Sequence, residues 1–358
     1  MHPGKDTRLN LTMVGDWGTA NFHTIWGWVS AHLRWRSAPL SRFNIRTGSA
    51  YRDSVELVGM GEADLSVTTP IHIGVRWARD GQHFYAARAF PNLRTLGHLP
   101  QDDRLTLAVR ADTGVRSFAD IREKKPVLHI AMPPRADDCL CSYVIDLILR
   151  AHGIEPEDIL RWGGSYWYHE NPRATIKAAQ EGRCNAVFNE AIMVSNWSDL
   201  VAQQPMRFIP IEPEAMRTLQ QAYGLKPAVL EKGRLRNEQD VPCLDWSHWG
   251  ILCRDDMPEE LAYRVTRRGG TTVTAGLPHP EARWPLQHVN LTAEERTVKG
   301  SYVGSCVPPR DMPRYIDLYR KGRLPVNKLM SDHITLDQIN EGFDRLASGH
   351  TVRQIIML

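Results

Sequence analysis

The sequence predicts an α/β protein with two similar lobes, followed by a segment of different character. Three observations lead to this prediction. Short apolar runs alternate with helical periods, the alternation returns about 120 residues later, and it ends near Thr266. Strands that alternate with helices favour parallel sheets whose faces are covered by the helices. A chain of 358 residues is also long enough for two or three compact units.

The first lobe begins with a strand over residues 9–14, because Leu9, Leu11 and Met13 fall on one face. A turn over 15–19 then leads into a helix. The expected elements after this turn are a helix at 24–36, a strand at 43–46, a helix at 51–60 that stops at Gly61, and a strand at 63–67.

The second lobe, at roughly 125–210, repeats this order. The turn at 182–185 has the same arrangement of helix stop, turn and strand entry as the turn at 61–64. The expected elements are a strand at 127–131, a loop at 133–138, a helix at 139–152, a helix at 174–181 and a strand at 185–188. Two such units predict two separate sheets and no single large one.

A ligand site is expected between the lobes. In open α/β sheets, ligands bind outside the carboxyl ends of the strands, where helix N-termini offer unpaired N–H groups to anions. The residues that follow the predicted strands are therefore candidate ligand contacts. They are Gly15, Asp16, Trp17, Thr19, Thr47, Gly48, Ser49, Thr68, Thr69, Arg135, Asp137, Trp167, Asn189 and Glu190.

Each polar candidate has a structural alternative. Asp16 can face a ligand or cap the following helix. The run 47–49 can donate hydroxyl and backbone N–H groups to a carboxylate, or form a turn that needs small residues. Arg135 can bind a ligand anion bidentately, or pair with Asp137 or Asp138.

The aromatic candidates form a group in the sequence around residues 163 and 164. Trp162, Trp167 and Tyr168 can stack on a ligand ring, and the alternative is packing in the core or at the hinge. The histidines show no i, i+4 pairs beside carboxylates, and no G-x-S-x-G motif is present. We therefore expect neither a metal site nor nucleophilic catalysis.

Residues 8–265 resemble the TAXI-type solute-binding proteins of tripartite ATP-independent periplasmic (TRAP) transporters. The resemblance rests on motifs that occur in the same order: Gly15 to Phe22, Arg46 to Ser49, Gly61 to Val67, Leu107 to Gly114, Ser117 to Asp120, Met206 to Pro210 and Arg254 to Tyr263. It implies a two-lobed periplasmic-binding-protein-like (type II) fold that closes by a hinge. It also implies capture of a small organic anion and TRAP membrane subunits as partners.

Two features depart from that family. No secretion signal precedes Leu9, so we expect a cytoplasmic protein, or a periplasmic one if the true start lies upstream. The loop at 133–138 is Pro-Pro-Arg-Ala-Asp-Asp, where the family usually has a small Gly/Ser-rich loop. The second departure predicts a ligand unlike the common ones.

Residues 267–358 have a different pattern. A Gly-led strand is expected at 268–278, followed by the runs 289–292 and 296–302. A helix at 313–321 should bury one stripe, formed by Tyr315, Ile316, Leu318 and Tyr319. A second helix should begin at a capping box formed by Thr335 and Gln338 and end at Gly349, with its apolar face formed by Leu336, Ile339, Phe343 and Leu346.

This segment resembles the C-terminal end of zinc-dependent medium-chain alcohol dehydrogenases. The matching residues are 269–278, 294–302, 310–315, 336–343 and 351–353. The resemblance implies part of a Rossmann sheet, an Arg353 placed to touch a cofactor, and self-association through 267–302.

The chemistry of such an enzyme is not expected here. The sequence has no G-x-G-x-x-G motif after a strand and no set of catalytic zinc ligands. We therefore expect no cofactor, no metal and no dehydrogenase activity. The alternatives to a solute receptor are a remnant or subunit of a dehydrogenase-like enzyme, and a cytoplasmic ligand sensor.

Composition excludes several further classes. The net charge is +3 with both signs interspersed, so no nucleic-acid partner is expected. Six cysteines without a C-x-x-C pair predict reduced, structural thiols. No apolar run is long enough to span a bilayer.

Overall fold

The chain forms two compact units in the computed structural model. The first unit contains residues 1–267 and 284–289, and the second contains 268–283 and 290–358. The structure describes residues 8–16, 22–34, 37–48, 51–99, 101–190, 192, 194–257, 269–274, 281, 283, 284, 286, 288–301, 306–347 and 353–357.

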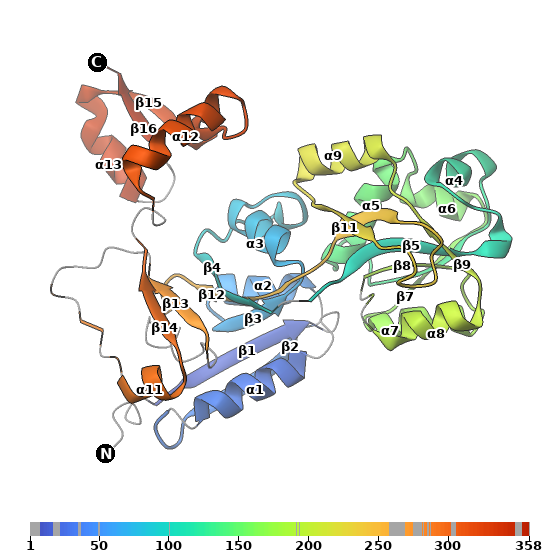
Figure 1. The fold of residues 1–358 in the computed structure, drawn as a ribbon, viewed down its shortest axis with the longest axis horizontal. Helices are drawn as coiled ribbons and strands as arrows, with labels where there is room; N and C mark the ends of the chain where they lie inside the picture. Colours follow the sequence, from blue (N-terminus) through green and yellow to red (C-terminus); the bar gives the residue numbers. More distant parts are fainter. Residues whose placement is uncertain are drawn as a thin grey trace. The chain divides into compact units, whose positions relative to one another are not determined.

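The first lobe is built on a five-stranded sheet with the order β2-β1-β3-β12-β4 (Figure 1). Its strands are β1 (Asn10–Asp16), β2 (Arg42–Gly48), β3 (Leu65–Thr68), β4 (Leu93–Leu99) and β12 (Trp249–Arg254). Its helices are α1 (Phe22–Arg34), α2 (Tyr51–Gly59), α3 (Ile71–Asp80) and the 3₁₀-helix η1 (His83–Tyr85). β1 runs parallel to β2 and β3, whereas β12 is antiparallel to both of its neighbours.

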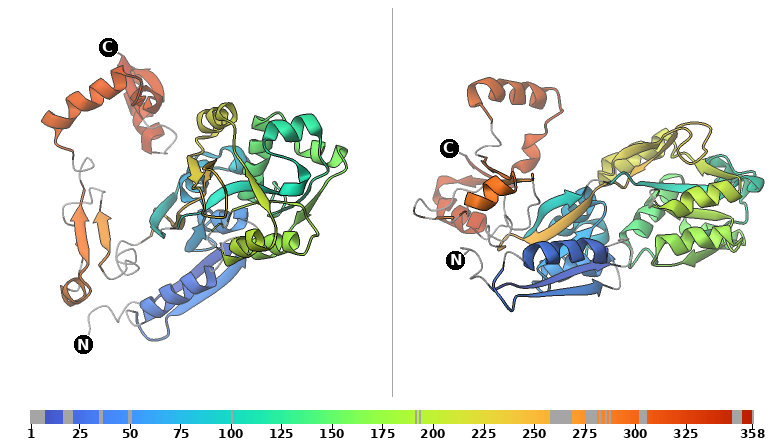
Figure 2. Two further views of the ribbon diagram at one scale, coloured as in Figure 1. Left: turned by 45° about the vertical axis from the view of Figure 1, so that its right-hand side comes forward. Right: turned by 60° about the horizontal axis from the view of Figure 1, so that its bottom comes forward.

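The alternation in β1 places its apolar residues as predicted. Leu11 and Met13 are buried, and Met13 packs with Ile25 and Trp26 of α1. The indole Nε1 of Trp26 donates to the Val14 carbonyl at 3.0 Å, so this buried polar group has a partner. α2 and α3 cover the opposite face of the sheet (Figures 1 and 2).

The second lobe is built on a seven-stranded sheet with the order β10-β11-β5-β8-β6-β7, in which β9 also pairs with β5. Its strands are β5 (Arg104–Arg110), β6 (His129–Met132), β7 (Ser165–Tyr168), β8 (Ala186–Asn189), β9 (Met206–Ile209), β10 (Pro227–Leu230) and β11 (Val241–Asp245). Its helices are η2 (Ala111–Thr113), α4 (Phe118–Lys124), α5 (Leu140–Ala151), α6 (Pro156–Arg161), α7 (Pro172–Gln180), α8 (Ser195–Gln203) and α9 (Pro213–Tyr223).

The two-lobed α/β fold is therefore confirmed, but two details of the prediction are wrong. The second sheet takes its strands from residues 104–245 rather than from 125–210. Both sheets are mixed, because β5 is antiparallel to β8, β9 and β11, and β12 is antiparallel to β3. The strand–helix alternation indicates only local units and does not show that the chain crosses between lobes twice.

Two short crossings join the lobes, one from β4 to β5 and one from β11 to β12. They are bonded to each other, because the Trp246 carbonyl accepts from Gln101 Nε2 at 2.9 Å and from Thr69 Oγ1 at 3.3 Å. The Trp246 N–H donates to the Asp103 carbonyl at 3.1 Å. One group of contacting buried side chains includes Trp77 of the first lobe, Leu140 of the second lobe and Trp246.

The second unit contains two separate pairs of parallel strands. The pairs are β13 (Thr271–Thr274) with β14 (Thr297–Gly300), and β15 (Asp332–Thr335) with β16 (Gln354–Met357). The helices along this part of the chain are α11 (His288–Ala293), α12 (Pro308–Arg320), η4 (Val326–Leu329), η5 (Leu336–Gln338) and α13 (Ile339–Ala347). The capping box of Thr335 and Gln338 is present.

The predicted burial of the helical stripe in this unit is wrong. α12 begins at Pro308 rather than at Pro313. Tyr315, Ile316 and Tyr319 are 42%, 47% and 45% exposed, and Leu318 is half-buried. On the face of the last helix, Leu336 and Phe343 are also exposed. The amphipathic period is real, but a pair of strands offers too little surface to cover it. No helix in the described part of the chain is long and apolar enough to cross a membrane.

Candidate ligand-binding site

The candidate residues of the first lobe share one sheet edge. β1 and β2 end in register, with Gly15 opposite Thr47 and Asp16 opposite Gly48. Gly15 is also opposite Val67 of β3, which places Thr68 and Thr69 directly beside them. The carboxyl ends of the three parallel strands therefore meet at this edge.

Some of these candidates fall outside the described residues, namely Trp17, Thr19 and Ser49. For Asp16, Thr47 and Gly48 the structure describes the strand but not the side-chain environment. The choice between a ligand contact and a helix cap at Asp16, and between a carboxylate cradle and a turn at 47–49, therefore stays a prediction.

The candidates of the second lobe lie at the matching edge of the second sheet. Asn189 ends β8 opposite Thr106 of β5, and both Asn189 and Glu190 are buried. Asn189 Nδ2 donates to Thr175 Oγ1 at 2.5 Å, and its Oδ1 accepts from the Glu190 N–H at 2.8 Å. The Glu190 carbonyl accepts from Trp197 Nε1 at 3.1 Å. These bonds lie inside the lobe and fix the shape of its edge.

The two edges meet beside the start of α3. A Cβ atom at Gly74 would lie 3.7 Å from Thr68 Oγ1 and 3.9 Å from Leu140 Cδ2. Thr68 of the first lobe and the first turn of α5 in the second lobe therefore flank the same glycine. The N-cap residue of α5, Cys139, makes no side-chain capping bond. An uncapped N-terminus of a twelve-residue helix favours a nearby anion.

Three buried polar atoms along this junction have no hydrogen-bond partner among the described residues. They are Thr68 Oγ1, Thr106 Oγ1 and Trp246 Nε1. Leaving such a group unpaired costs about 1–3 kcal/mol, so each favours a water or a ligand atom as its partner. The neighbouring Thr69 differs, because its hydroxyl donates to the Trp246 carbonyl and holds the crossing in place.

Arg135 and Asp137 lie on the exposed loop after β6. Burial raises the pKa of Tyr168 and the charge of Arg135 opposes that rise, which places the guanidinium near this phenol. Among the ion pairs of the described chain, none joins Arg135 to Asp137 or Asp138. Arg135 lies on the loop that leads from β6 into α5, so Arg135 and the N-terminus of α5 are on the same side of the second lobe.

The aromatic residues of β7 do not form a single group. Trp167 packs against the core beneath α7 and α8, and Arg183 lies over its ring at 4.8 Å from the centroid. Tyr168 points to the opposite face and stacks on Tyr166 with ring centroids 5.8 Å apart. Trp162 packs against the other core. The packing alternative therefore accounts for the position of Trp167.

Asp146 is a half-buried carboxyl on α5 in the same region. Burial raises its pKa, Arg150 opposes that rise, and the negative charges of Glu157, Asp137 and Glu155 add to it, so that the pKa is about 6. The folded state therefore favours the protonated carboxyl. The protonated carboxyl makes its full contribution to the free energy of unfolding below pH ~4, and this contribution is lost as the pH rises through about 6.

We expect Asp146→Asn to stabilise the protein at pH 7.5, because the amide stays neutral where the carboxylate is ionised. The gain should be about 1 kcal/mol after solvent screening, and should shrink toward zero at pH 4.5. Urea unfolding at both pH values measures it. Asp199→Asn, at an exposed position on α8, is the control and should change stability by less than about 0.5 kcal/mol at either pH. An equal gain at both pH values would contradict the assignment.

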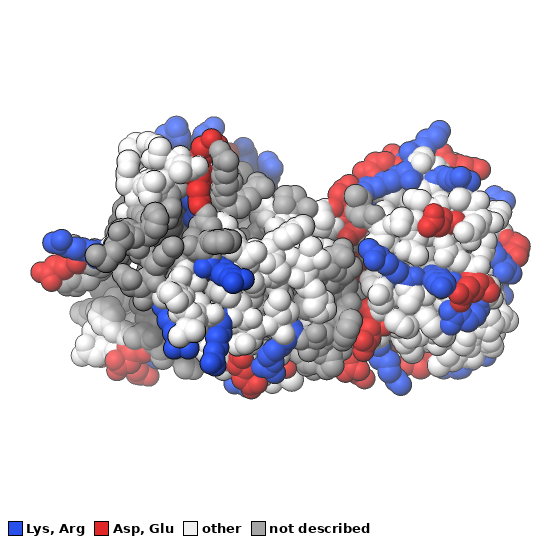
Figure 3. All heavy atoms as spheres, turned by 90° about the horizontal axis from the view of Figure 1, so that it is seen from below, with Lys and Arg blue, Asp and Glu red and all other residues white. Residues whose placement is uncertain are grey.

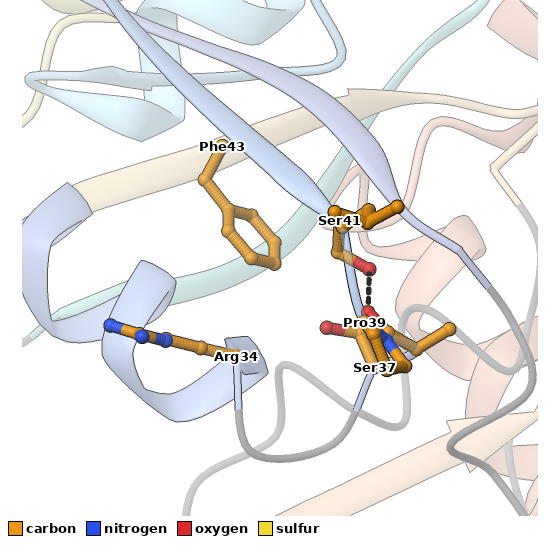
Figure 4. Close-up of a pocket in the computed structure, with 7 residues that line it drawn as sticks. Arg34, Ser37, Pro39, Ser41 and Phe43 are labelled. Carbon is orange, nitrogen blue, oxygen red and sulfur yellow. Dashed lines mark hydrogen bonds between the residues drawn. The ribbon is translucent and has the colours of Figure 1, made fainter.

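Three surface hollows lie away from these edges. One of about 570 Å³ is at the start of β2, where Arg34, Ser37 and Phe43 line it and Ser41 Oγ donates to the Ala38 carbonyl at 2.7 Å (Figure 4). A second of about 720 Å³ lies between β9 and the loop at 235–241. A third of about 430 Å³ runs along α3. None of the candidate residues lines any of the three.

The described residues contain few groups of the kind that bind metal ions or react through a thiolate. No group of three His, Cys, Asp or Glu side chains in the described part of the chain is placed to hold a metal ion. The six cysteines form no disulfide with one another, and five of them are buried. Positive and negative side chains alternate over the second lobe, so this surface shows no charged face (Figure 3).

The sequence did not point to the residues of the crossings. Gln101, Thr106 and Trp246 approach the site through pairings between distant strands, and no motif marks them. The sequence itself offers one local signal there, the pair of tryptophans Trp246 and Trp249 after the run 241–244.

Comparison with known proteins relates the two parts of the chain to different groups. The chain is 36% identical over 104 residues to the putative alcohol dehydrogenase D of Mycobacterium tuberculosis (strain ATCC 25618 / H37Rv), covering 29% of this chain and 28% of that protein. It is 35% identical over 99 residues to the NDMA-dependent alcohol dehydrogenase of Amycolatopsis methanolica, covering 27% of this chain and 26% of that protein. The chain therefore spans only about a quarter of the length of these curated relatives.

Solved structures with a similar arrangement have low identity. PhnD1 from Prochlorococcus marinus in complex with methylphosphonate is 11% identical with a TM-score of 0.41, covering 72% of this chain and 82% of that chain. The effector-binding domain of QuiR in complex with shikimate is 11% identical with a TM-score of 0.39, covering 72% of this chain and 93% of that chain. Residues 42–268, more than half of the chain, match the model of the NMT1-like family. This chain belongs to the NMT1-like family.

Proposed function

We propose that the first unit binds a small organic anion where the edges of its two sheets meet. The observation that carries this proposal is a set of buried polar groups with no partner among the described residues: Thr68 Oγ1 at the junction, Thr106 Oγ1 on β5 and Trp246 Nε1 in the second crossing. A hydroxyl or indole N–H that is kept from water needs a partner, and a bound ligand supplies one. No covalent step is required.

Two features favour a negatively charged ligand. The N-terminus of α5 has no side-chain cap and lies beside Thr68 through their shared contact with Gly74. Helix N-termini stabilise anions through their N–H groups and the helix dipole. Arg135, on the loop that leads into α5, adds a guanidinium for bidentate binding of a carboxylate.

The finer assignment is a solute receptor of the TAXI type, with TRAP membrane subunits as partners, or a relative that senses the same ligand in the cytoplasm. The match to the NMT1-like family covers residues 42–268, which include most of both lobes, and ends where the dehydrogenase-like segment begins. The pair of short crossings supports closure by a hinge, with Gln101 and Trp246 at the pivot.

A second function concerns the dehydrogenase-like segment. The identity to alcohol dehydrogenases supports a remnant or a subunit of such an enzyme, and the exposed stripe of α12 supports self-association of this chain. The sequence lacks a G-x-G-x-x-G motif and catalytic zinc ligands, so independent dehydrogenase activity and a nucleotide cofactor are not proposed.

The test is a melting-temperature screen of the full chain. The panel contains mono- and dicarboxylates, aromatic acids and amino acids, together with NAD(H) and NADP(H). A ligand at a hundred times its dissociation constant should add roughly 2.7 kcal/mol of stability. We expect a shift with an organic acid and none with the nucleotides. A shift with NAD(H) alone would overturn the proposal.

The position of the site is tested with two matched variants. Thr68→Val keeps the shape of the side chain but removes the buried hydroxyl, so it should weaken the affinity for the identified acid roughly tenfold. Thr218→Val makes the same change at an exposed position on α9 and should leave the affinity within about twofold. Equal affinities in both variants would place the ligand elsewhere.

A further inference from the structure

The hollow along α3 is separate from the proposed solute site and has its own chemistry. It is a groove of about 430 Å³ between α3 and β4. The helix contributes His72, Arg76, Arg79 and Asp80, and the strand contributes Thr95 and His98. All of these residues belong to the first lobe, and none of them is a candidate contact for the solute.

The helix aligns its basic residues along this groove. His72, Arg76 and Arg79 are separated by four and three positions, which places them on one face of α3. Asp80 is the single acidic side chain in the described lining. The strand provides donors on the opposite wall, the Thr95 hydroxyl and the His98 ring. An acceptor in the groove can therefore be reached from two sides.

The surroundings of His72 show that positive charge prevails here. Burial lowers the pKa of His72, and the positive charges of Lys226, Arg76 and His248 lower it as well; with Asp245 acting in the opposite direction, the pKa is about 4. His72 Nε2 is buried without a partner among the described residues. His98 and His248 face each other with ring centroids 5.2 Å apart. Arg76, Arg79 and Lys226 thus carry positive charge in or beside the groove, against the negative charges of Asp80 and Asp245, and His72 is neutral near pH 7.

The two guanidiniums are available to different extents. Arg76 Nη2 donates to the Tyr223 carbonyl at the end of α9 at 2.7 Å. This bond fixes the side chain and leaves the other N–H groups of the guanidinium for an anion. Arg79 is exposed and forms no ion pair with the described residues. One guanidinium is held in place and the other is free to close on an anion.

We propose that this groove binds a tetrahedral oxyanion of the phosphate or sulfate type. Arg76 and Arg79 hold its charge from the helix, and Thr95 and His98 donate hydrogen bonds from the strand. Donors on two opposed walls suit an acceptor whose oxygens point in several directions, better than a planar carboxylate, and arginine is suited to such anions. The anion site is separate from the solute site and does not depend on it.

The test is calorimetric titration of the full chain with inorganic phosphate and with glycerol 3-phosphate at constant ionic strength. We expect saturable binding to one site. Arg79→Gln should weaken it at least tenfold, while its melting temperature should stay close to that of the parent chain because the side chain is exposed. Arg42→Gln removes the same charge from an exposed position on β2 of the same lobe and should leave the affinity within twofold.

Three outcomes would overturn the proposal. Binding that does not saturate, or that Arg42→Gln weakens as much as Arg79→Gln, would mean a general charge effect. Binding that Arg135→Gln abolishes and Arg79→Gln spares would place the phosphate in the solute site. If the ester binds more tightly than free phosphate, the natural anion is a phosphate monoester, and the reverse order indicates the inorganic ion.

Discussion

Replacing Trp246 with alanine is expected to lower the free energy of unfolding by about 3–5 kcal/mol. The side chain is fully buried in the second crossing and packs with residues of both lobes. Its truncation leaves a cavity where the two lobes share one core. The backbone hydrogen bonds of the crossing do not replace the lost side-chain packing. Urea unfolding of the full chain, followed by circular dichroism, measures the loss.

Two further variants make this prediction specific. Trp28→Ala truncates the same residue type on α1, where the side chain is 71% exposed, and should change stability by less than about 0.5 kcal/mol. Trp246→Phe keeps an aromatic ring but removes the buried Nε1–H, so its loss should be clearly smaller than that of alanine. If Trp246→Ala and Trp28→Ala behaved alike, the shared core of the lobes would be disproved.

Gly164→Ala is expected to destabilise the protein by about 3 kcal/mol, at the upper end of overpacking costs. Gly164 lies between α6 and β7, and an added Cβ would collide with the Leu128 carbonyl oxygen and lie 2.9 Å from the Ile159 carbonyl oxygen. Both atoms belong to the backbone, so neither can turn aside as a side chain would. β6 and β7 would have to separate.

The matched control for this change is Gly97→Ala. Gly97 lies on β4, and an added Cβ would meet no heavy atom within 4 Å. Its effect on the free energy of unfolding should stay below about 0.5 kcal/mol. Thermal unfolding of both variants measures the difference, and equal melting temperatures would show that the strand contact at Gly164 is looser than described.

The sequence predicted the local elements of the first unit well. β1 buries Leu11 and Met13 as its alternation required, and α5 begins and ends within one residue of the predicted helix at 139–152. These patterns are local, since a helix or strand must bury one face and its own residues show which face. The same argument failed for α12, whose stripe is regular but exposed, because periodicity does not say what covers it.

The edges of the candidate site were also predictable, but the roles of its side chains were not. Thr68 and Thr69 follow a strand and could be placed near the cleft from that fact alone. Thr69 donates to the carbonyl of Trp246, 177 residues further along the chain, whereas the described part of the chain offers Thr68 Oγ1 no partner. Trp167 looked equally suited to stacking on a ligand or packing in the core, and the position of Arg183 over its ring favours packing.

The sequence by itself determined that this protein alternates strands and helices, forms two α/β lobes and changes character near residue 267. Each of these conclusions depends on spacing between neighbours, which hydrophobic burial and backbone geometry impose locally. Only the tertiary structure decided that the chain crosses twice between the lobes and that both sheets are mixed. It also aligned His72, Arg76 and Arg79 of α3 with Thr95 and His98 of β4 along one groove. Such contacts join residues that are distant in the chain, and the backbone pairings that bring them together leave no period in the sequence.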